Sequence, residues 1–124
     1  MPTTSLTRCE LEVMQVVWMR GEATVQDVVD ALDRTLAYTT VLTTLKILHE
    51  KRKVLGRKKR GRAHVYVPAV TCETVQRSML DELIQRLFGG STKSLVLNLI
   101  EHDALSADDI DEVKAAIAAL DEHP

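Results

Sequence analysis

A strongly basic segment with the pattern of a β-hairpin lies in the middle of this 124-residue chain. Apolar and polar residues alternate through 64–67, which predicts a strand, and Gly61 stands where a tight turn would fall. Pro68 cannot continue a strand ladder, so the strand is expected to end there. Like charges held this close together cost energy unless a polyanion neutralises them, and we call this basic hairpin the wing. The wing cations are Arg57, Lys58, Lys59, Arg60 and Arg62.

Three helices are expected before the wing. Thr7 and Glu10 have the spacing of a capping box, in which the two side chains satisfy free amides at a helix start. Thr24 and Asp27 repeat this spacing, and apolar residues recur at helical intervals after each cap. A third helix is expected over about 38–52. Three helices followed by a basic hairpin is the order of a winged helix-turn-helix.

The expected third helix has one apolar and one polar face. At 100° per residue, the apolar face holds Val41, Leu45 and Leu48. The opposite face holds Thr39, Thr43, Lys46 and Glu50, and Leu42 lies on the flank. The outward face of this helix therefore begins with hydroxyl groups and a cation.

This polar face and the wing together favour binding to duplex DNA. The major groove admits one helix, whose first residues reach the base edges, while cations neutralise phosphates. Residues 1–70 hold 12 basic and 7 acidic residues, whereas the remaining residues hold 4 and 11. A solvated helix face, a hairpin edge protected by charge, and chance charge placement are the alternatives. The candidate DNA-binding residues are Tyr38, Thr39, Thr40, Leu42, Thr43 and Lys46, with the wing cations Arg57, Lys58, Lys59, Arg60 and Arg62.

Residues 71–124 are expected to form three further helices that dimerise. The segments are about 72–88, 91–102 and 106 onward, divided by Gly89-Gly90 and by Ser106 as a cap. A unit this small buries too little surface to be stable alone, and its apolar residues nearly surround one helix, so a second copy is expected to cover them. Packing onto the chain's own winged helix is the alternative. The candidate dimer residues are Val75, Met79, Leu83, Leu87, Leu95, Val96, Leu99, Ile100, Ile110, Val113, Ile117 and Leu120.

The expected organisation is thus a winged helix-turn-helix DNA-binding domain over 1–70 and a three-helix dimerisation domain over 71–124. The expected fold class is mainly α with a small β-hairpin. Two such domains on a two-fold axis predict an operator with inverted half-sites.

Several other classes of function lack their sequence signals. No apolar run is long enough for a membrane span, and the N-terminus has no secretory signal pattern. The histidines have no metal-ligand spacing, and phosphate loops and nucleophile motifs are absent. Cys9 and Cys72 form no Cys-x-x-Cys pair and are expected to be free thiols. We therefore expect a cytoplasmic protein that is not an enzyme and takes no cofactor or metal.

Four stretches of the chain resemble the penicillinase repressor family of bacterial regulators (BlaI/MecI type, with copper-responsive relatives). They are Leu11-Glu12-Val13-Met14-Gln15-Val16-Val17-Trp18, Leu36-Ala37-Tyr38-Thr39-Thr40-Val41, Arg62-Ala63-His64-Val65-Tyr66 and Ser94-Leu95-Val96-Leu97-Asn98. The resemblance implies an N-terminal winged helix, a helical dimerisation region and repression at a dyad-symmetric operator. Arg52-Lys53 departs from the Gly-apolar pair that the family usually has after the third helix.

The resemblance also implies a way of relieving repression. In the family a membrane sensor with a zinc-protease domain detects an antibiotic, and cleavage of the repressor follows. The family's scissile bond matches Asn98-Leu99, although Leu99 stands where well-studied members have Phe. We therefore expect a homodimeric transcriptional repressor. The alternative is a winged helix that binds an acidic protein partner through its basic hairpin.

Overall fold

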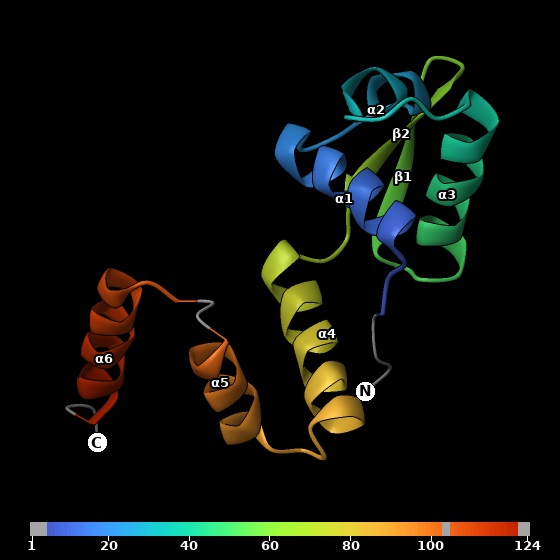
Figure 1. Cartoon of the computed structure of the whole chain (residues 1–124). Coiled ribbons are helices and arrows are strands. Elements are labelled where there is room, and N and C mark those ends of the chain that lie inside the picture. Colours follow the sequence, from blue (N-terminus) through green and yellow to red (C-terminus); the bar gives the residue numbers. More distant parts are fainter. Residues whose placement is uncertain (1–4, 103–104, 122–124) are drawn as a thin grey trace. The chain divides into compact units, whose positions relative to one another are not determined.

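The computed structural model describes residues 5–102 and 105–121 and consists mainly of helices with one two-stranded antiparallel hairpin (Figure 1). The elements are α1 (Arg8–Arg20), α2 (Val25–Ala31), α3 (Tyr38–Glu50), β1 (Leu55–Arg60), β2 (Ala63–Pro68), α4 (Cys72–Leu87), α5 (Thr92–Glu101) and α6 (Ala107–Asp121). The expected fold class is confirmed. Contacts divide the chain after Glu82 into two compact units, while the functional boundary between 70 and 71 stays a prediction.

Helices α1 and α2 both begin at the predicted capping boxes. The Thr7 hydroxyl accepts a hydrogen bond from the Glu10 amide at 3.2 Å, and the Glu10 carboxylate accepts one from the Thr7 amide at 2.9 Å. The Thr24 hydroxyl accepts the Asp27 amide at 3.1 Å, and the Asp27 carboxylate accepts the Thr24 amide at 3.0 Å. Each cap satisfies two amides that the helix itself leaves free, a contribution of about 1 kcal/mol per cap.

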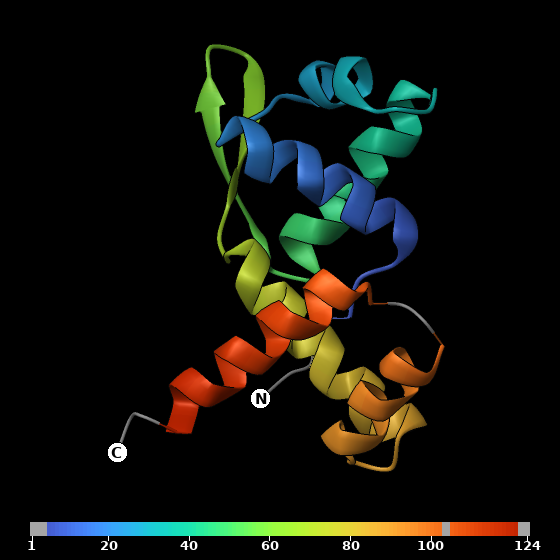
Figure 2. The same cartoon turned by 60° about the vertical axis from the view of Figure 1, so that its left-hand side comes forward.

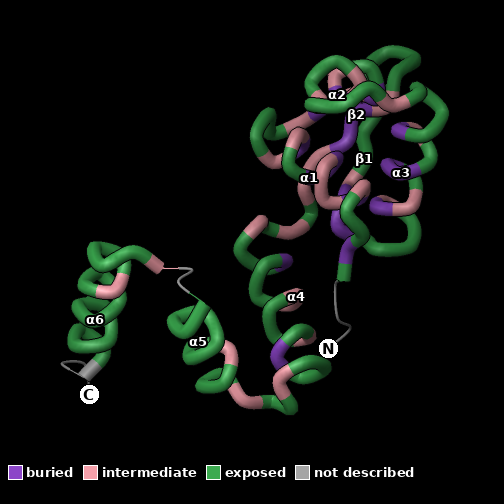
Figure 3. Tube along the Cα trace, viewed as in Figure 1, coloured by how far each residue is buried: buried purple, intermediate pink, exposed green. Residues whose placement is uncertain are grey.

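The hydrophobic core of the first unit lies among α1, α3 and the hairpin. Helix α1 packs on β2, and α3 packs on both α1 and β1, so the buried segments of these elements face one another (Figure 3). The predicted apolar face of α3 is confirmed, because Val41, Leu45 and Leu48 are fully buried. The buried cluster is Leu6, Val13, Met14, Val17, Ala23, Val25, Val28, Val41, Leu45, Leu48, Val54, Leu55, Tyr66 and Val75.

The hairpin forms as predicted, with a two-residue turn. Arg60 pairs with Ala63, and Gly61 adopts a φ of 63°, which suits the first position of a type II′ turn. The hairpin stands beside α1, and its turn projects past that helix (Figure 2). On the other edge of β2, Ala23 pairs with Tyr66 through backbone hydrogen bonds of 3.0 and 2.8 Å. This one-residue pairing fixes the hairpin to the connection between α1 and α2.

A lysine with a left-handed backbone conformation lies between α3 and β1. Lys53 has a φ of 58°, and the Val54 amide donates a hydrogen bond to the Leu48 carbonyl at 3.0 Å. Val54 and Leu48 both belong to the buried core. Lys53 thus occupies a backbone conformation that favours glycine.

Replacing Lys53 with Gly should raise the free energy of unfolding by about 0.5–1 kcal/mol, because glycine adopts the left-handed conformation without a Cβ clash. Urea unfolding followed by circular dichroism measures the change. Lys51→Gly is the matched control, since Lys51 has a φ of -94° and the same substitution there should lower stability. Equal losses in both variants would contradict the assigned conformation of Lys53.

The second unit holds the end of α4 with α5 and α6. Ser91 caps α5 by accepting the Ser94 amide at 3.1 Å, and Ser106 and Asp109 cap α6 reciprocally at 3.1 Å each. Helix α5 has no buried residue, and most of α6 is exposed as well (Figure 3). Among the described residues, no helix combines the length and hydropathy that crossing a membrane requires.

Candidate nucleic-acid interface

The outward face of α3 carries polar side chains that reach solvent. Thr39, Thr43 and Lys46 are exposed, while Val41 and Thr44 on the other side are buried. Leu42 is half-buried and packs partly against the core. The face predicted from helical periodicity is therefore the face that the fold leaves free.

Helix α3 begins without a side-chain cap, unlike α1 and α2. Ala37 occupies the N-cap position, and its carbonyl accepts the Val41 amide at 3.1 Å, but its side chain cannot accept a hydrogen bond. The amides of the first turn are consequently left to other acceptors. Tyr38 and Thr40 lie in this turn and are exposed, so an anion can approach the amides.

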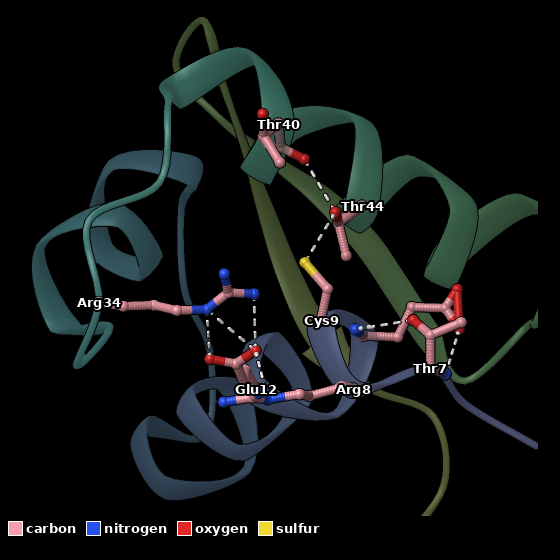
Figure 4. Close-up of polar contacts among 8 residues, drawn as sticks. Thr7, Arg8, Cys9, Glu12, Arg34, Thr40 and Thr44 are labelled. Carbon is pink, nitrogen blue, oxygen red and sulfur yellow. Dashed lines mark hydrogen bonds and ion pairs between the residues drawn. The ribbon is translucent and has the colours of Figure 1, made fainter.

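An ion pair holds the connection before α3 against α1. The Arg34 guanidinium donates to both carboxylate oxygens of Glu12, with Nε–Oε2 and Nη2–Oε1 distances of 2.9 Å (Figure 4). Hydrogen bonds from Arg34, followed by the charges of Arg34 and Arg8, hold the pKa of Glu12 below its ordinary value against the opposing effect of burial. The two-point geometry fixes orientation as well as distance.

Two further contacts fix α3 along its length. The Thr44 hydroxyl donates to the Thr40 carbonyl at 2.8 Å and lies 3.7 Å from the Cys9 sulfur of α1 (Figure 4). After the C-terminal end of the helix, Arg52 Nε lies 3.3 Å from Glu10 Oε1, and Glu10 is buried. The polar face of α3 is thus presented by a helix attached to α1 before its start, at its middle and after its end.

The strand alternation of β1 places the wing cations on two faces. Lys58 and Arg60 share one face, and both contact Glu22 in the connection between α1 and α2. Arg57 and Lys59 share the other face, where they pair in register with Tyr66 and His64. Arg62 lies in the turn, and all five wing cations are exposed.

The face with Arg57 and Lys59 is the one that turns toward α3. Tyr66 packs edge-on against His49 of α3, with ring centroids 6.4 Å apart. His64 lies on the same face, two residues before Tyr66. Its pKa is lowered by burial and then by the charges of Arg57, Lys59, Lys46 and His49. Cations from the wing and from α3 therefore gather around His64.

His64 makes folding stability sensitive to pH. Its Nδ1 is buried and has no hydrogen-bond partner among the described residues, so a proton there is disfavoured in the folded protein. The folded-state pKa lies below the ordinary 6.5. The contribution of neutral His64 to the free energy of unfolding is therefore fully present above about pH 6.5. It is lost as the pH falls through the folded-state pKa, because the unfolded chain binds the proton first.

Replacing His64 with Gln should make the free energy of unfolding less sensitive to a change from pH 7.5 to pH 5.5 than in the unmodified protein. Urea unfolding at both values measures this difference. His102→Gln is the control, because His102 is exposed and its side chain bonds to the Asn98 carbonyl one turn earlier. An identical pH dependence in all three proteins would show that His64 does not carry the linkage.

The candidate dimer residues fall into three groups by exposure. Val75 is buried, and Met79 packs against the same core of the first unit, so this chain already covers them. Leu95 and Ile110 are partly exposed. The others are exposed by at least 39%: Leu83, Leu87, Val96, Leu99, Ile100, Val113, Ile117 and Leu120.

Sequence reasoning missed the residues that position this interface. These residues form ion pairs whose members are 22 to 42 residues apart in the sequence. The pairs are Glu12 with Arg34, Glu10 with Arg52, and Glu22 with Arg60. Local patterns carry no signal for such pairs. In the described part of the chain, no three His, Cys, Asp or Glu side chains are grouped to hold a metal ion.

Three helices, the third with a polar outward face, are followed by a basic hairpin. This arrangement defines a winged helix-turn-helix protein. Residues 6–119 match the family model described as penicillinase repressor, so the chain belongs to that family. It is a family of transcriptional regulators and not of enzymes.

Individual relatives are similar over nearly the whole chain. The transcriptional regulator BlaI of Mycobacterium tuberculosis is 38% identical over 95% of this chain and 86% of its own length. The penicillinase repressor of Bacillus licheniformis is 29% identical over 95% and 91% of the two chains. The methicillin resistance regulatory protein MecI of Mammaliicoccus sciuri is 27% identical over 90% and 92%.

Proposed function

We propose that this chain is a homodimeric transcriptional repressor that binds a dyad-symmetric DNA operator in the bacterial cytoplasm. The observation that carries the proposal is the exposed Thr39–Thr43–Lys46 face of a helix anchored to α1, beside a wing of exposed cations. In this arrangement α3 is the recognition helix in the major groove, and the wing lies on the DNA backbone. Membership of a family of repressors supports the same conclusion.

The residues of the interface divide into two roles. Thr39 and Thr43 can hydrogen-bond base edges and offer methyl groups to thymine, and Lys46 can reach a guanine or a phosphate. Leu42 contributes the exposed part of its side chain to a thymine methyl. Tyr38, Thr40 and the free amides of the first turn bind phosphate, as do the wing cations Arg57, Lys58, Lys59, Arg60 and Arg62.

Replacing Thr43 with Ala should cost about 1–3 kcal/mol on the selected operator and much less on random duplex, because a base contact is lost. The operator is first recovered by selection from random duplexes, and fluorescence anisotropy then measures both affinities at fixed salt. Thr44→Ala is the matched control, since Thr44 is the next residue but is buried against Cys9. It should leave the ratio of the two affinities unchanged.

Equal losses on both duplexes would instead make Thr43 a backbone contact. If the unmodified protein binds no duplex at low salt, the alternative gains support, in which the basic hairpin meets an acidic protein partner.

Exposed apolar faces on the last helices support the homodimer. Leu99 and Ile100 of α5, and Ile117 and Leu120 of α6, are between 41% and 71% exposed. Apolar side chains gathered on successive helices favour burial against another surface. A second copy of the chain would cover these faces with the same faces of its own. The two recognition helices would then be related by a two-fold axis and would bind a dyad-symmetric site. The dimer contacts thus come from the exposed candidates, while Val75 and Met79 serve the core.

Relief of repression by proteolysis is proposed at the Asn98-Leu99 bond, with a membrane sensor metalloprotease as the partner. Both residues are exposed, but they lie inside α5, where the Asn98 carbonyl accepts the His102 amide at 3.2 Å. A protease needs an extended substrate, so α5 has to open locally before it can be cut. Cleavage would separate residues 99–124 and with them the apolar face of α6.

A chain that ends at Asn98 should be monomeric and should bind the operator at least tenfold more weakly, since the two recognition helices lose their linkage. Sedimentation velocity and anisotropy measure these two properties. The winged helix should remain folded, because its core lies before residue 83. A stable dimer with undiminished affinity would exclude this route to derepression.

A further inference from the structure

One carboxylate holds two of the wing cations. Glu22 Oε2 accepts a hydrogen bond from Arg60 Nη2 at 2.9 Å and lies 3.1 Å from Lys58 Nζ. All three side chains reach solvent, with exposures of 38% for Glu22, 56% for Lys58 and 64% for Arg60. Hydrogen bonds from Lys58 and then Arg60 keep the pKa of Glu22 below its ordinary value, so the carboxylate is charged at neutral pH.

The backbone, rather than this ion pair, determines where the wing lies. Glu22 directly precedes Ala23, whose amide and carbonyl both pair with Tyr66 of β2. The β1–β2 ladder then places Lys58 opposite Val65 and Arg60 opposite Ala63. Since ion pairs between exposed side chains contribute little to stability, Glu22 is not needed to keep the wing folded.

The remaining wing cations carry no such partner. Within residues 5–102 and 105–121, Arg57, Lys59 and Arg62 form no ion pair with a carboxylate, although all three are exposed. The free protein therefore offers three uncompensated cations to a polyanion, and it holds two more on a carboxylate that has the charge and acceptor geometry of a DNA phosphate oxygen.

We propose that Glu22 is an internal competitor of the DNA backbone, which holds Lys58 and Arg60 in the free protein and thereby limits sequence-independent binding. The proposal rests on the DNA binding proposed above. On DNA a phosphate has to displace Glu22 from these two side chains, and Glu22 itself repels that phosphate. Because phosphate contacts carry no sequence information, the weakening applies equally to operator and non-operator DNA.

Glu22→Gln should bind a mixed-sequence duplex of roughly 30 base pairs about three- to tenfold more tightly than the unmodified full-length protein at 0.1 M salt. The plot of log affinity against log salt should steepen by about 1–2, since each newly neutralised phosphate adds about 0.9 to the slope. Anisotropy titrations at several salt concentrations measure both quantities. Thermal unfolding should show nearly the same midpoint in both proteins.

Glu73→Gln is the control for net charge. Glu73 is exposed on α4, so this substitution removes the same charge away from the wing ion pairs. Equal gains in the two variants would show a general charge effect and overturn the proposal. Weaker binding by Glu22→Gln would also overturn it, since Glu22 would then be holding the wing in its binding position.

A second comparison tests the route through the two cations. In a background of Lys58→Ala with Arg60→Ala, the added Glu22→Gln change should give less than a twofold gain in affinity, because no held cation remains to be released. An undiminished gain there would overturn the proposed competition. Absence of salt-dependent duplex binding by the unmodified protein would be a failure of the proposed function itself, and it is measured in the same titrations.

Discussion

Two backbone hydrogen bonds between Ala23 and Tyr66 join the helical part of the winged helix to its hairpin, and the arrangement of the candidate DNA-binding surface depends on them. A two-stranded hairpin is marginally stable by itself. The Ala23 pairing occupies the other edge of β2, so this strand is bonded on both sides at its centre. Tyr66 is also buried in the core against His49 of α3. This residue pair therefore adds to the packing of α1 on β2 and of α3 on β1 that holds the wing and α3 in one framework.

The local features of this fold could be predicted from the sequence. The caps at Thr7 and Thr24 use residues three positions apart, and the two faces of α3 follow from helical geometry alone. The contacts that position the interface could not be predicted, because their partners meet only after folding. Arg34 reaches Glu12 across 22 residues of sequence, and Arg60 reaches Glu22 across 38.

Helix α4 shows the limit of periodicity in another way. Its regular apolar spacing groups Val75, Met79, Leu83 and Leu87 into one stripe, which sequence analysis assigned as a whole to dimerisation. In the structure Val75 is 1% exposed and belongs to the core of the first unit, whereas Leu87 is 70% exposed. The spacing carries no information on which surface covers each turn of the helix.

The missing side-chain cap on α3 has a consequence for motion. A helix whose first turn has no acceptor for its amides frays more readily than one with a capping box, and Ala37 provides no such acceptor. The first-turn amides, including those of Tyr38 and Thr39, should therefore exchange hydrogen with solvent faster than those of the capped α1. A bound phosphate would complete this turn. In the proposed complex with DNA, local ordering of this turn and phosphate binding would thus be coupled, and part of the intrinsic affinity would be spent on ordering it.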